Sequence, residues 1–177
     1  MKKLFVSLFS FLIILLAQAQ SPEDTTDGRF RDELLNNLVG KWDVTATVHE
    51  TKFTLDLDAE WVLDHQYLEI HWKSHQVVPW LKIPFEEICF VGYNRLYKRY
   101  FVHEVSVHGG GGSYEGFCYA YKTGNEIKFV MLPDSDKTME QRFIWEPKTK
   151  SWSIVSRQIV DGKEGEPYIV MKLTARK

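Results

Sequence analysis

The segment from Phe53 to Leu63 constrains the fold of this chain more than any other stretch. Apolar side chains stand at its odd-numbered positions, and all but one of its even-numbered positions are polar. Successive side chains of a β-strand point to opposite faces, so this period of two predicts a strand with one buried and one solvated face. A chain with such a strand needs partner strands and a core on one side of the sheet.

The same period recurs from Trp42, where the even-numbered residues to Val48 share one face. Turn signals interrupt it at short, even intervals, and the sequences at 123–125 and 161–165 contain the residues that tight hairpins require. We expect about ten strands, with no long helix among them. They begin near Trp42, Phe53, Tyr67, Phe85, Arg99, Ser113, Glu126, Thr138, Ser151 and Pro167. Because closing such a meander removes its two edges, the pattern predicts an all-β fold, an antiparallel up-and-down β-barrel.

The N-terminus has the three parts of a secretory signal peptide. Lys2 and Lys3 precede an apolar run from Leu4 to Leu16, and the small-x-small sequence 17–19 follows it. The run is shorter than the roughly 20 residues that a membrane-spanning helix needs. We therefore expect cleavage after Ala19, a periplasmic or secreted location, and no stable membrane insertion of the mature chain.

A short helix is expected before the first strand. Leu34, Leu35 and Leu38 follow helical spacing, and Gly40 suits the left-handed cap of a helix end. We expect this helix at roughly residues 29–38, where it would plug one end of the barrel. The expected organisation is a signal peptide at 1–19, a polar lead with the short helix at 20–37, and the barrel domain at 38–177.

The charge of the chain excludes one class of partner. The chain has 22 Lys and Arg against 24 Asp and Glu. Cleavage after Ala19 removes two lysines and leaves a net charge of −4, without a basic stripe. Contacts with nucleic-acid phosphates need clustered Lys and Arg, so we expect no nucleic-acid partner.

Several short segments resemble a bacterial family called domain of unknown function 1579. The similar segments are 38–44 (Leu-Val-Gly-Lys-Trp-Asp-Val), 92–94 (Gly-Tyr-Asn), 98–100 (Lys-Arg-Tyr) and 174–177 (Thr-Ala-Arg-Lys). The resemblance covers roughly residues 34–177, with Asn94 in place of the family's usual aspartate and a different sequence at 102–104. It implies a calycin-like barrel related to lipocalins and fatty-acid-binding proteins. It leaves the function open, because one fold hosts many functions.

The resemblance also suggests a contact between the two ends of the barrel domain. Lipocalins pair a Gly-x-Trp in their first strand with an arginine near the C-terminus, and Trp42 and Arg176 occupy similar positions here. The first and last strands must pair if the barrel closes. We therefore expect the Arg176 guanidinium to lie over the Trp42 indole in a cation–π contact.

The two cysteines, Cys89 and Cys118, fall inside expected strands. In an exported protein an even number of cysteines permits a disulfide. A buried free thiol would instead act as a small hydrophobe. Both interpretations remain open, and neither cysteine has a predicted catalytic role.

The sequence predicts no metal, cofactor or catalytic site. Six histidines are scattered over the expected strands and turns, without a motif that brings three or four zinc ligands together. No histidine follows His108, although the haem-binding nitrobindin-like relatives of this fold have a late axial histidine. The sequence His-Gly-Gly-Gly at residues 108–111 resembles the oxyanion loop of some esterases, but the Gly-x-Ser-x-Gly motif is missing. We expect a hairpin loop at the barrel mouth at Gly109–Gly112.

Aromatic residues make up 14% of the chain and many fall in strand centres. Such side chains either wall an apolar pocket or fill a small barrel. We favour a pocket of roughly 300 Å³ or more that opens toward Gly109–Gly112. The candidate ligand-binding residues are Trp61, Trp72, Tyr100, Glu104, Phe117, Tyr119, Arg142, Phe143 and Trp145.

Glu104 is the candidate polar group of this pocket, together with Arg142. If Tyr100 and Val102 face inward, Glu104 does too and needs a partner, for which Arg142 and Arg157 are candidates. A bulge in the strand would leave Glu104 in solvent instead, and the sequence does not separate these alternatives.

These observations favour an exported, non-enzymatic barrel that binds a small apolar or amphipathic molecule. One alternative is a hydrolase or isomerase that uses an interior acid such as Glu104, which a perturbed carboxyl beside a basic group would favour. Another is a structural envelope or interaction protein with a filled barrel, which an exposed apolar patch would favour.

Overall fold

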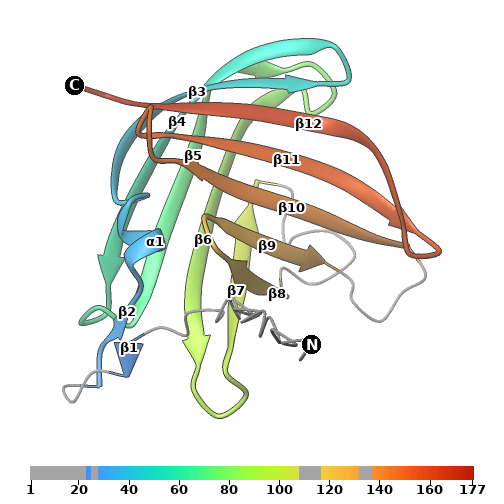
Figure 1. The fold of residues 1–177 in the computed structure, drawn as a ribbon. Helices are drawn as coiled ribbons and strands as arrows, with labels where there is room; N and C mark the ends of the chain where they lie inside the picture. The colour runs from blue at the N-terminus through green and yellow to red at the C-terminus, as the bar shows by residue number, and fades with distance from the viewer. Residues whose placement is uncertain (1–22, 25–27, 108–116, 132–136) are drawn as a thin grey trace, which may run out of the picture.

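The protein is a closed antiparallel barrel of ten strands (Figure 1). The computed structural model describes residues 23–24, 28–107, 117–131 and 137–177. The expected signal peptide and the Gly109–Gly112 loop lie outside the described residues. The barrel strands are β3 (Gly40–Val48), β4 (Thr51–Val62), β5 (Tyr67–Val78), β6 (Ile83–Asn94), β7 (Arg99–Ser106), β8 (Phe117–Thr123), β9 (Glu126–Met131), β10 (Lys137–Glu146), β11 (Ser151–Val160) and β12 (Lys163–Ala175). The predicted all-β, up-and-down barrel is confirmed.

The barrel closes by pairing its first and last strands. Each strand pairs with its neighbour in sequence, and β12 also pairs with β3 over a register that runs from Ile169–Val48 to Ala175–Trp42. Closure leaves no strand of the barrel with an unpaired edge, which is the physical advantage of the architecture.

Two of the hairpin turns adopt the left-handed backbone that tight connections need. His49 and Glu50 join β3 to β4 with φ of 43° and 72°, and Asp161 and Gly162 join β11 to β12 with φ of 51° and 72°. Two successive residues with positive φ match the right-handed twist of the strands that they connect. These hairpins lie at the same end of the barrel.

The alternation that predicts β4 is observed up to the end of the strand. The odd-numbered residues from Phe53 to Ala59 are buried and Trp61 is half-buried. Leu63, predicted to share this face, lies beyond the strand with φ of 50° and is 70% exposed. Left-handed backbone at Leu63, Asp64 and His65 forms the turn to β5 and ends the period of two.

A single helical turn, α1 (Glu33–Asn36), packs into the other end and lies at the left in Figure 1. Asp32 caps it, because its Oδ1 accepts the backbone N–H of Leu35 at 2.9 Å. Leu34, Leu35 and Leu38 are buried in the barrel core. We call this the closed end.

The helix is shorter than the predicted span of residues 29–38. Phe30–Arg31 is extended and forms β2, which pairs with β1 (Glu23–Asp24). The strand pairing and the Asp32 cap together delay the start of the helix until Glu33. No helix among the described residues is long and apolar enough to cross a membrane.

Three indole N–H groups hold the end of α1 in place. They donate from Trp42 to the Leu38 carbonyl at 2.7 Å, from Trp152 to the Asn37 carbonyl at 3.1 Å, and from Trp61 to Asn36 Oδ1 at 2.8 Å. The last carbonyls of a helix lack partners inside it. The tryptophans therefore satisfy polar groups and fill the closed end at the same time.

A buried ion pair completes the closed end. Asp32 Oδ2 accepts hydrogen bonds from Tyr100 Oη and Lys122 Nζ, each at 2.6 Å. Burial, followed by the negative charge of Asp32, holds the pKa of Tyr100 well above its usual range. Tyr100 therefore remains a hydrogen-bond donor to Asp32.

Arg176 and Trp42 do not form the predicted cation–π contact. Ala175 is the residue opposite Trp42, so Arg176 lies on the other face of the sheet. Its guanidinium donates to Asp43 Oδ1 at 2.8 Å and also to Asp56 on the outer surface. The pairing of the first and last strands is observed, as predicted. The predicted side-chain contact is wrong, because Arg176 is one residue beyond the position that shares a face with Trp42.

Candidate ligand-binding cavity

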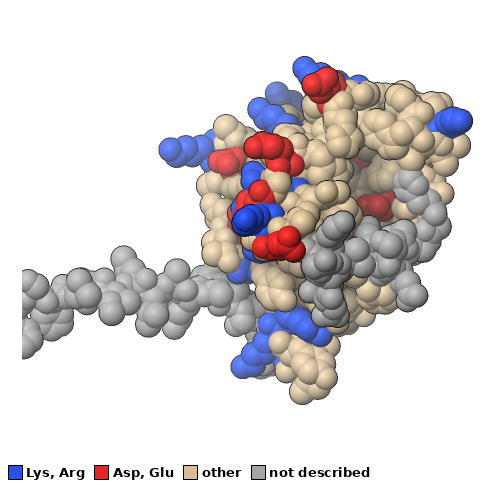
Figure 2. All heavy atoms as spheres, turned by 90° about the vertical axis from the view of Figure 1, so that its right-hand side faces the viewer, with Lys and Arg blue, Asp and Glu red and all other residues tan. Residues whose placement is uncertain are grey.

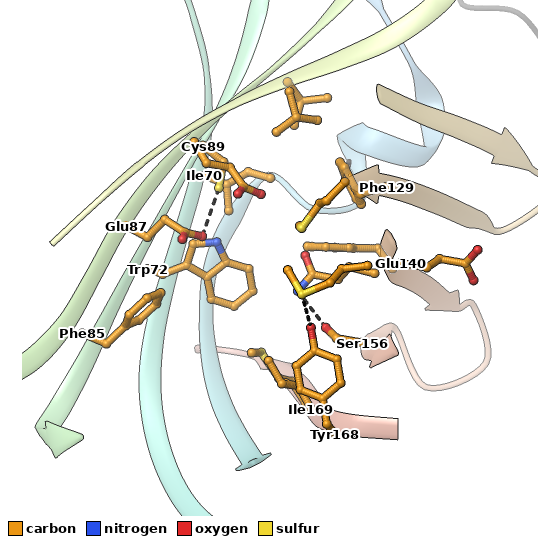
Figure 3. A pocket seen from close by; sticks show the side chains of 18 residues that line it. Ile70, Trp72, Phe85, Glu87, Cys89, Phe129, Glu140, Ser156, Tyr168 and Ile169 are labelled. Carbon is orange, nitrogen blue, oxygen red and sulfur yellow. Dashed lines mark hydrogen bonds between the residues drawn. The ribbon is translucent and has the colours of Figure 1, made fainter. Parts of the chain in front are cut away.

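A cavity of about 240 Å³ lies in the barrel interior, and we call it the inner cavity. Inward-facing residues of β5, β6, β7, β9, β10, β11 and β12 line it (Figure 3). Phe143 packs between two other aromatic rings of the wall, with centroids 6.2 Å from Trp72 and 4.8 Å from Phe129. Edge-to-face packing of this kind fixes the rings and so keeps the shape of the apolar wall.

A second space of about 480 Å³ adjoins the inner cavity at the end opposite α1, and we call it the mouth chamber. Its apolar wall includes Phe53, Leu55, Val78, Trp80 and Leu81. The two spaces share the wall residues Phe85, Tyr168, Ile169 and Met171. Figure 2 faces this end and shows a hollow among mostly uncharged side chains. The described part of the interior is thus hollow toward the mouth and filled toward α1.

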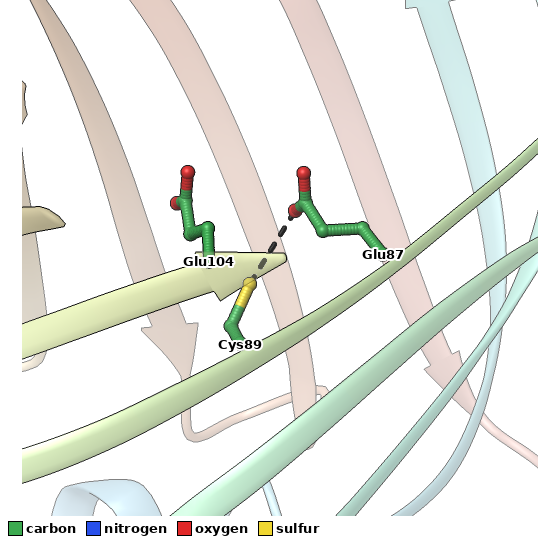
Figure 4. Close-up of side chains that lie close together, drawn as sticks. All are labelled: Glu87, Cys89 and Glu104. Carbon is green, nitrogen blue, oxygen red and sulfur yellow. Dashed lines mark hydrogen bonds between the residues drawn. The ribbon is translucent and has the colours of Figure 1, made fainter. Parts of the chain in front are cut away.

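Two carboxyl groups and a thiol meet in the wall of the inner cavity (Figure 4). Cys89 of β6 lies opposite Glu104 of β7, and Glu87 is two residues before Cys89 on the same face. One carboxylate oxygen of each glutamate and the thiol sulfur lie within 4.8 Å of one another. Cys89 Sγ donates to Glu87 Oε1 at 3.4 Å. We call these three residues the acidic group.

Burial shapes the protonation of the acidic group. It raises the pKa of Glu87, although the hydrogen bond from Cys89 opposes part of that effect. Burial also raises the pKa of Cys89 well above its usual range, and the charges of Glu87 and Glu104 add to the effect. Cys89 is therefore a neutral thiol near neutral pH, and Glu87 holds its proton to a higher pH than a solvated glutamate.

Cys89 and Cys118 are both free and buried. They stand on β6 and β8, with β7 between them. Neighbouring strands lie about 4.8 Å apart, so two strand spacings exceed the roughly 7 Å between Cα atoms that a disulfide can bridge. Burial and the nearby carboxylates also raise the pKa of Cys118. The free-thiol interpretation is therefore the one that the strand order supports.

Three of the candidate residues line the inner cavity. They are Trp72 of β5, Glu104 of β7 and Phe143 of β10, and all three are buried. The inward orientation of Glu104 decides between the two alternatives left by the sequence, because β7 continues without a bulge through that position. Ligand binding by these residues remains a prediction.

Three other candidate residues lie at the closed end. Trp61 and Tyr100 bond to the α1 segment, as described above. Trp145 packs against Trp42 and Trp152, with ring centroids 6.5 and 5.3 Å away. These aromatic side chains fill the barrel below the inner cavity and do not line it.

The remaining three candidates, Phe117, Tyr119 and Arg142, lie on the outer surface. The inward residues of β8 are Cys118 and Ala120, so the pleat turns their neighbours outward. Phe117 is 57% exposed and stacks on His103, and Tyr119 has the Arg99 guanidinium 3.6 Å from its ring centroid.

Arg142 is likewise not a polar contact of the cavity. It bonds to Glu140 and Glu164 outside the barrel, on the face opposite that of Phe143. The structure therefore removes Arg142 from the predicted pocket and leaves Glu104 in it.

Sequence reasoning missed Glu87, Cys89 and the residues shared by the two spaces. The available signal was the Glu-x-Cys spacing of residues 87 and 89, which places both side chains on one face of a strand. That signal shows only that two residues share a face. The pairing of β6 with β7 adds Glu104, and no local pattern contains that information.

The acidic group can do two kinds of chemistry. Its oxygens can accept hydrogen bonds from a cationic or neutral donor head of a ligand. Thiolate and carboxylate are also ligands that Zn²⁺ takes. Zinc binding would require Cys89 to lose its proton, which the raised pKa of that thiol opposes.

No protein-family model matches the chain, and no curated protein matches it significantly. The resemblance to the domain of unknown function 1579 family therefore rests on its short motifs. A closed barrel of ten antiparallel strands is compatible with the calycin-like fold that the resemblance implies.

Proposed function

We propose that this protein is an exported β-barrel that binds a small apolar or amphipathic molecule in its interior. One observation carries the proposal: the inner cavity joins an apolar mouth chamber through shared wall residues. The chamber of about 480 Å³ falls within the range of small-molecule sites, which is roughly 300–1,000 Å³.

The physical reason for binding is the apolar surface that the two spaces present. Aromatic and aliphatic side chains make up most of both walls, and a guest that covers them removes that surface from water. Burial contributes about 25 cal/mol per Å² of apolar surface, before the loss of ligand freedom is subtracted. The few polar groups, Glu87 and Glu104 among them, orient the guest.

Titration with Nile red, an uncharged fluorophore that brightens in apolar surroundings, tests the proposal. Emission should saturate near one equivalent, and Trp72→Ala should weaken binding by about tenfold or more, because it removes a large part of the wall. Phe117→Ala is the matched control, since this aromatic residue faces outward. Unsaturable emission in the folded protein would contradict interior binding.

Export is tested separately. In a host that secretes the protein, N-terminal sequencing of the mature chain should begin at Gln20, as the Ala-x-Ala cleavage sequence predicts. A cytosolic product that still begins at Met1 would contradict export and would leave the binding proposal unaffected.

Acid–base catalysis is a second candidate function, because the pKa of Glu87 is raised in a cavity beside Glu104. A raised pKa keeps a carboxylic acid protonated to a higher pH, and the protonated form is the one that acts in general acid catalysis. Turnover of a panel of ester and ketone substrates that is lost in Glu87→Gln would favour it over binding alone.

A further inference from the structure

The charged side chains among the described residues that line the inner cavity are all acidic. Glu87 and Glu104 contribute carboxyl groups, and no lysine, arginine or histidine lies among the described residues that line this cavity. Glu140 also borders it, but the carboxylate of Glu140 points away from the cavity (Figure 3). It bonds outside the barrel to Arg142 and, at 3.2 Å, to Lys128.

Four other described side chains of the wall are neutral and form two bonded pairs. Gln141 Nε2 donates to Ser156 Oγ at 3.1 Å, and Tyr168 Oη donates to Met139 Sδ at 2.9 Å. The acidic group is therefore the strongest electrostatic feature that a guest would meet in the described wall of the inner cavity.

We propose that the inner cavity selects amphiphiles with a cationic ammonium head, which binds at Glu87 and Glu104 while the apolar tail extends into the mouth chamber. This inference rests on the proposed function and adds the chemical class of the ligand. It predicts preference for an alkylammonium ion over a neutral alcohol, and for the alcohol over a fatty-acid carboxylate.

Electrostatics gives the order of preference. Two carboxyl groups close together in a buried space resist double ionisation, and a cation beside them relieves that repulsion. An ammonium head also has three N–H donors for the carboxylate oxygens. A carboxylate head would add a third negative group where the local dielectric is low, so its repulsion would be strong.

The geometry suits a ligand whose ammonium head lies deep in the inner cavity and whose apolar tail extends toward the mouth. The carboxylates of Glu87 and Glu104 extend in the same direction from neighbouring strands (Figure 4). Phe85, Tyr168 and Met171 line both spaces and form an apolar path between them. A tail that follows this path meets Phe53 and Leu55 in the wall of the mouth chamber.

Calorimetric titration of the whole protein with decylammonium, decanol and decanoate tests the inference at neutral pH, below the micelle concentration of each. The tails are equal, so the affinities report the head group. Decylammonium should bind at least about tenfold more tightly than decanol, because hydrogen bonds between charged groups are stronger than those of a neutral hydroxyl. Decanoate should bind most weakly of the three.

Two variants and one control locate the effect. Glu87→Gln and Glu104→Gln should each reduce the preference for decylammonium over decanol by about tenfold, and both should still bind Nile red. Glu86→Gln removes the same charge one residue away on the outer face and should leave the preference unchanged. Circular dichroism confirms folding, and either glutamine variant alone suffices for the test if the other does not fold.

The possible failures are distinguishable. Equal affinity for the three heads, or tightest binding of decanoate, would overturn the ammonium inference and leave the proposed function intact. Saturable binding of Zn²⁺ without any binding of decylammonium would also overturn it, because the acidic group would then be a metal site. Failure of Nile red and of all three amphiphiles would refute the proposed function itself.

Discussion

The two ends of the barrel interior differ in packing: one is filled by side chains and the other is hollow. At the closed end, α1 and its buried leucines fill the space, and each of three tryptophans donates a hydrogen bond to the helix segment. Toward the mouth, aromatic rings stand around an open space, and two carboxyl groups share a buried wall. Satisfied polar groups and dense packing stabilise a fold. A hollow with clustered acids is less stabilising, and such a site is where the proposed binding would take place.

The largest expected difference between the two ends concerns tryptophan. Trp152→Ala should lower the free energy of unfolding by about 3–5 kcal/mol, because the ring is fully buried in the filled end. Trp72→Ala should lower it by less, since the Trp72 ring already borders a cavity. Urea unfolding measures both values, and Nile red titration should show weaker binding for Trp72→Ala alone. Equal losses of stability would contradict the looser packing around Trp72 that the cavity implies.

Breaking the buried ion pair of the closed end should cause the next largest loss of stability. Asp32→Asn should destabilise the protein by about 3 kcal/mol, because it removes the counter-charge of the buried Lys122 side chain. The expected value is at the low end for such pairs, since asparagine can still cap α1. Thermal unfolding checks it, with Lys41→Gln at an exposed ion pair as the control. Similar melting temperatures for the two variants would contradict the role of Asp32 as the anchor of the closed end.

Adjacent glutamates of β6 should respond oppositely to pH. Burial raises the pKa of Glu87, so its ionisation penalises the folded state as pH rises from 4.5, its ordinary pKa, through the raised value. Glu87→Gln should therefore gain stability relative to the natural protein over that range, and show little difference below it. The gain should be smaller than either loss described above.

Glu86 provides the contrast on the outer face. Hydrogen bonds from His71 and Lys73 lower the pKa of Glu86, so its stabilising contribution is present above pH 4.5 and is lost as pH falls through the lowered value. Glu86→Gln should lose a small amount of stability above pH 4.5. Stability measured from pH 3 to 8 should give difference curves of opposite sign for the two variants. Curves of the same sign would contradict the buried position of Glu87.

The smallest change in stability is expected at Arg176, which follows the strand β12 that closes the barrel against β3. Arg176→Ala removes bonds to Asp43 and Asp56 on the solvent-exposed surface, where ion pairs contribute little. The melting temperature should fall slightly, more at low salt than at high salt. Ligand affinity should not change. A large loss of stability would mean that the pairing of β12 with β3 depends on this residue.

The orientation of side chains that the sequence predicts is wrong most clearly at β8. The sequence Phe-Cys-Tyr-Ala-Tyr at residues 117–121 has apolar or aromatic residues on both faces. Size and hydrophobicity alone therefore predict that the larger residues face the interior. In the structure the smaller Cys118 and Ala120 face inward, while Phe117 and Tyr119 stack on His103 and Arg99 outside. Size and hydrophobicity do not decide the face of a strand when both faces can be stabilised by contacts.

The sequence by itself determined the barrel, because a period of two between short turns has few stable arrangements other than a closed meander. It also determined the plug, since the three leucines at 34, 35 and 38 form an apolar face that must be buried, and they lie in the barrel core. Only the tertiary structure decided that Glu87 and Cys89 meet Glu104, and that Arg142 lies outside. The physical reason is register: pairing of strands far apart in the chain selects which side chains meet, and a slip of one residue would reverse every face.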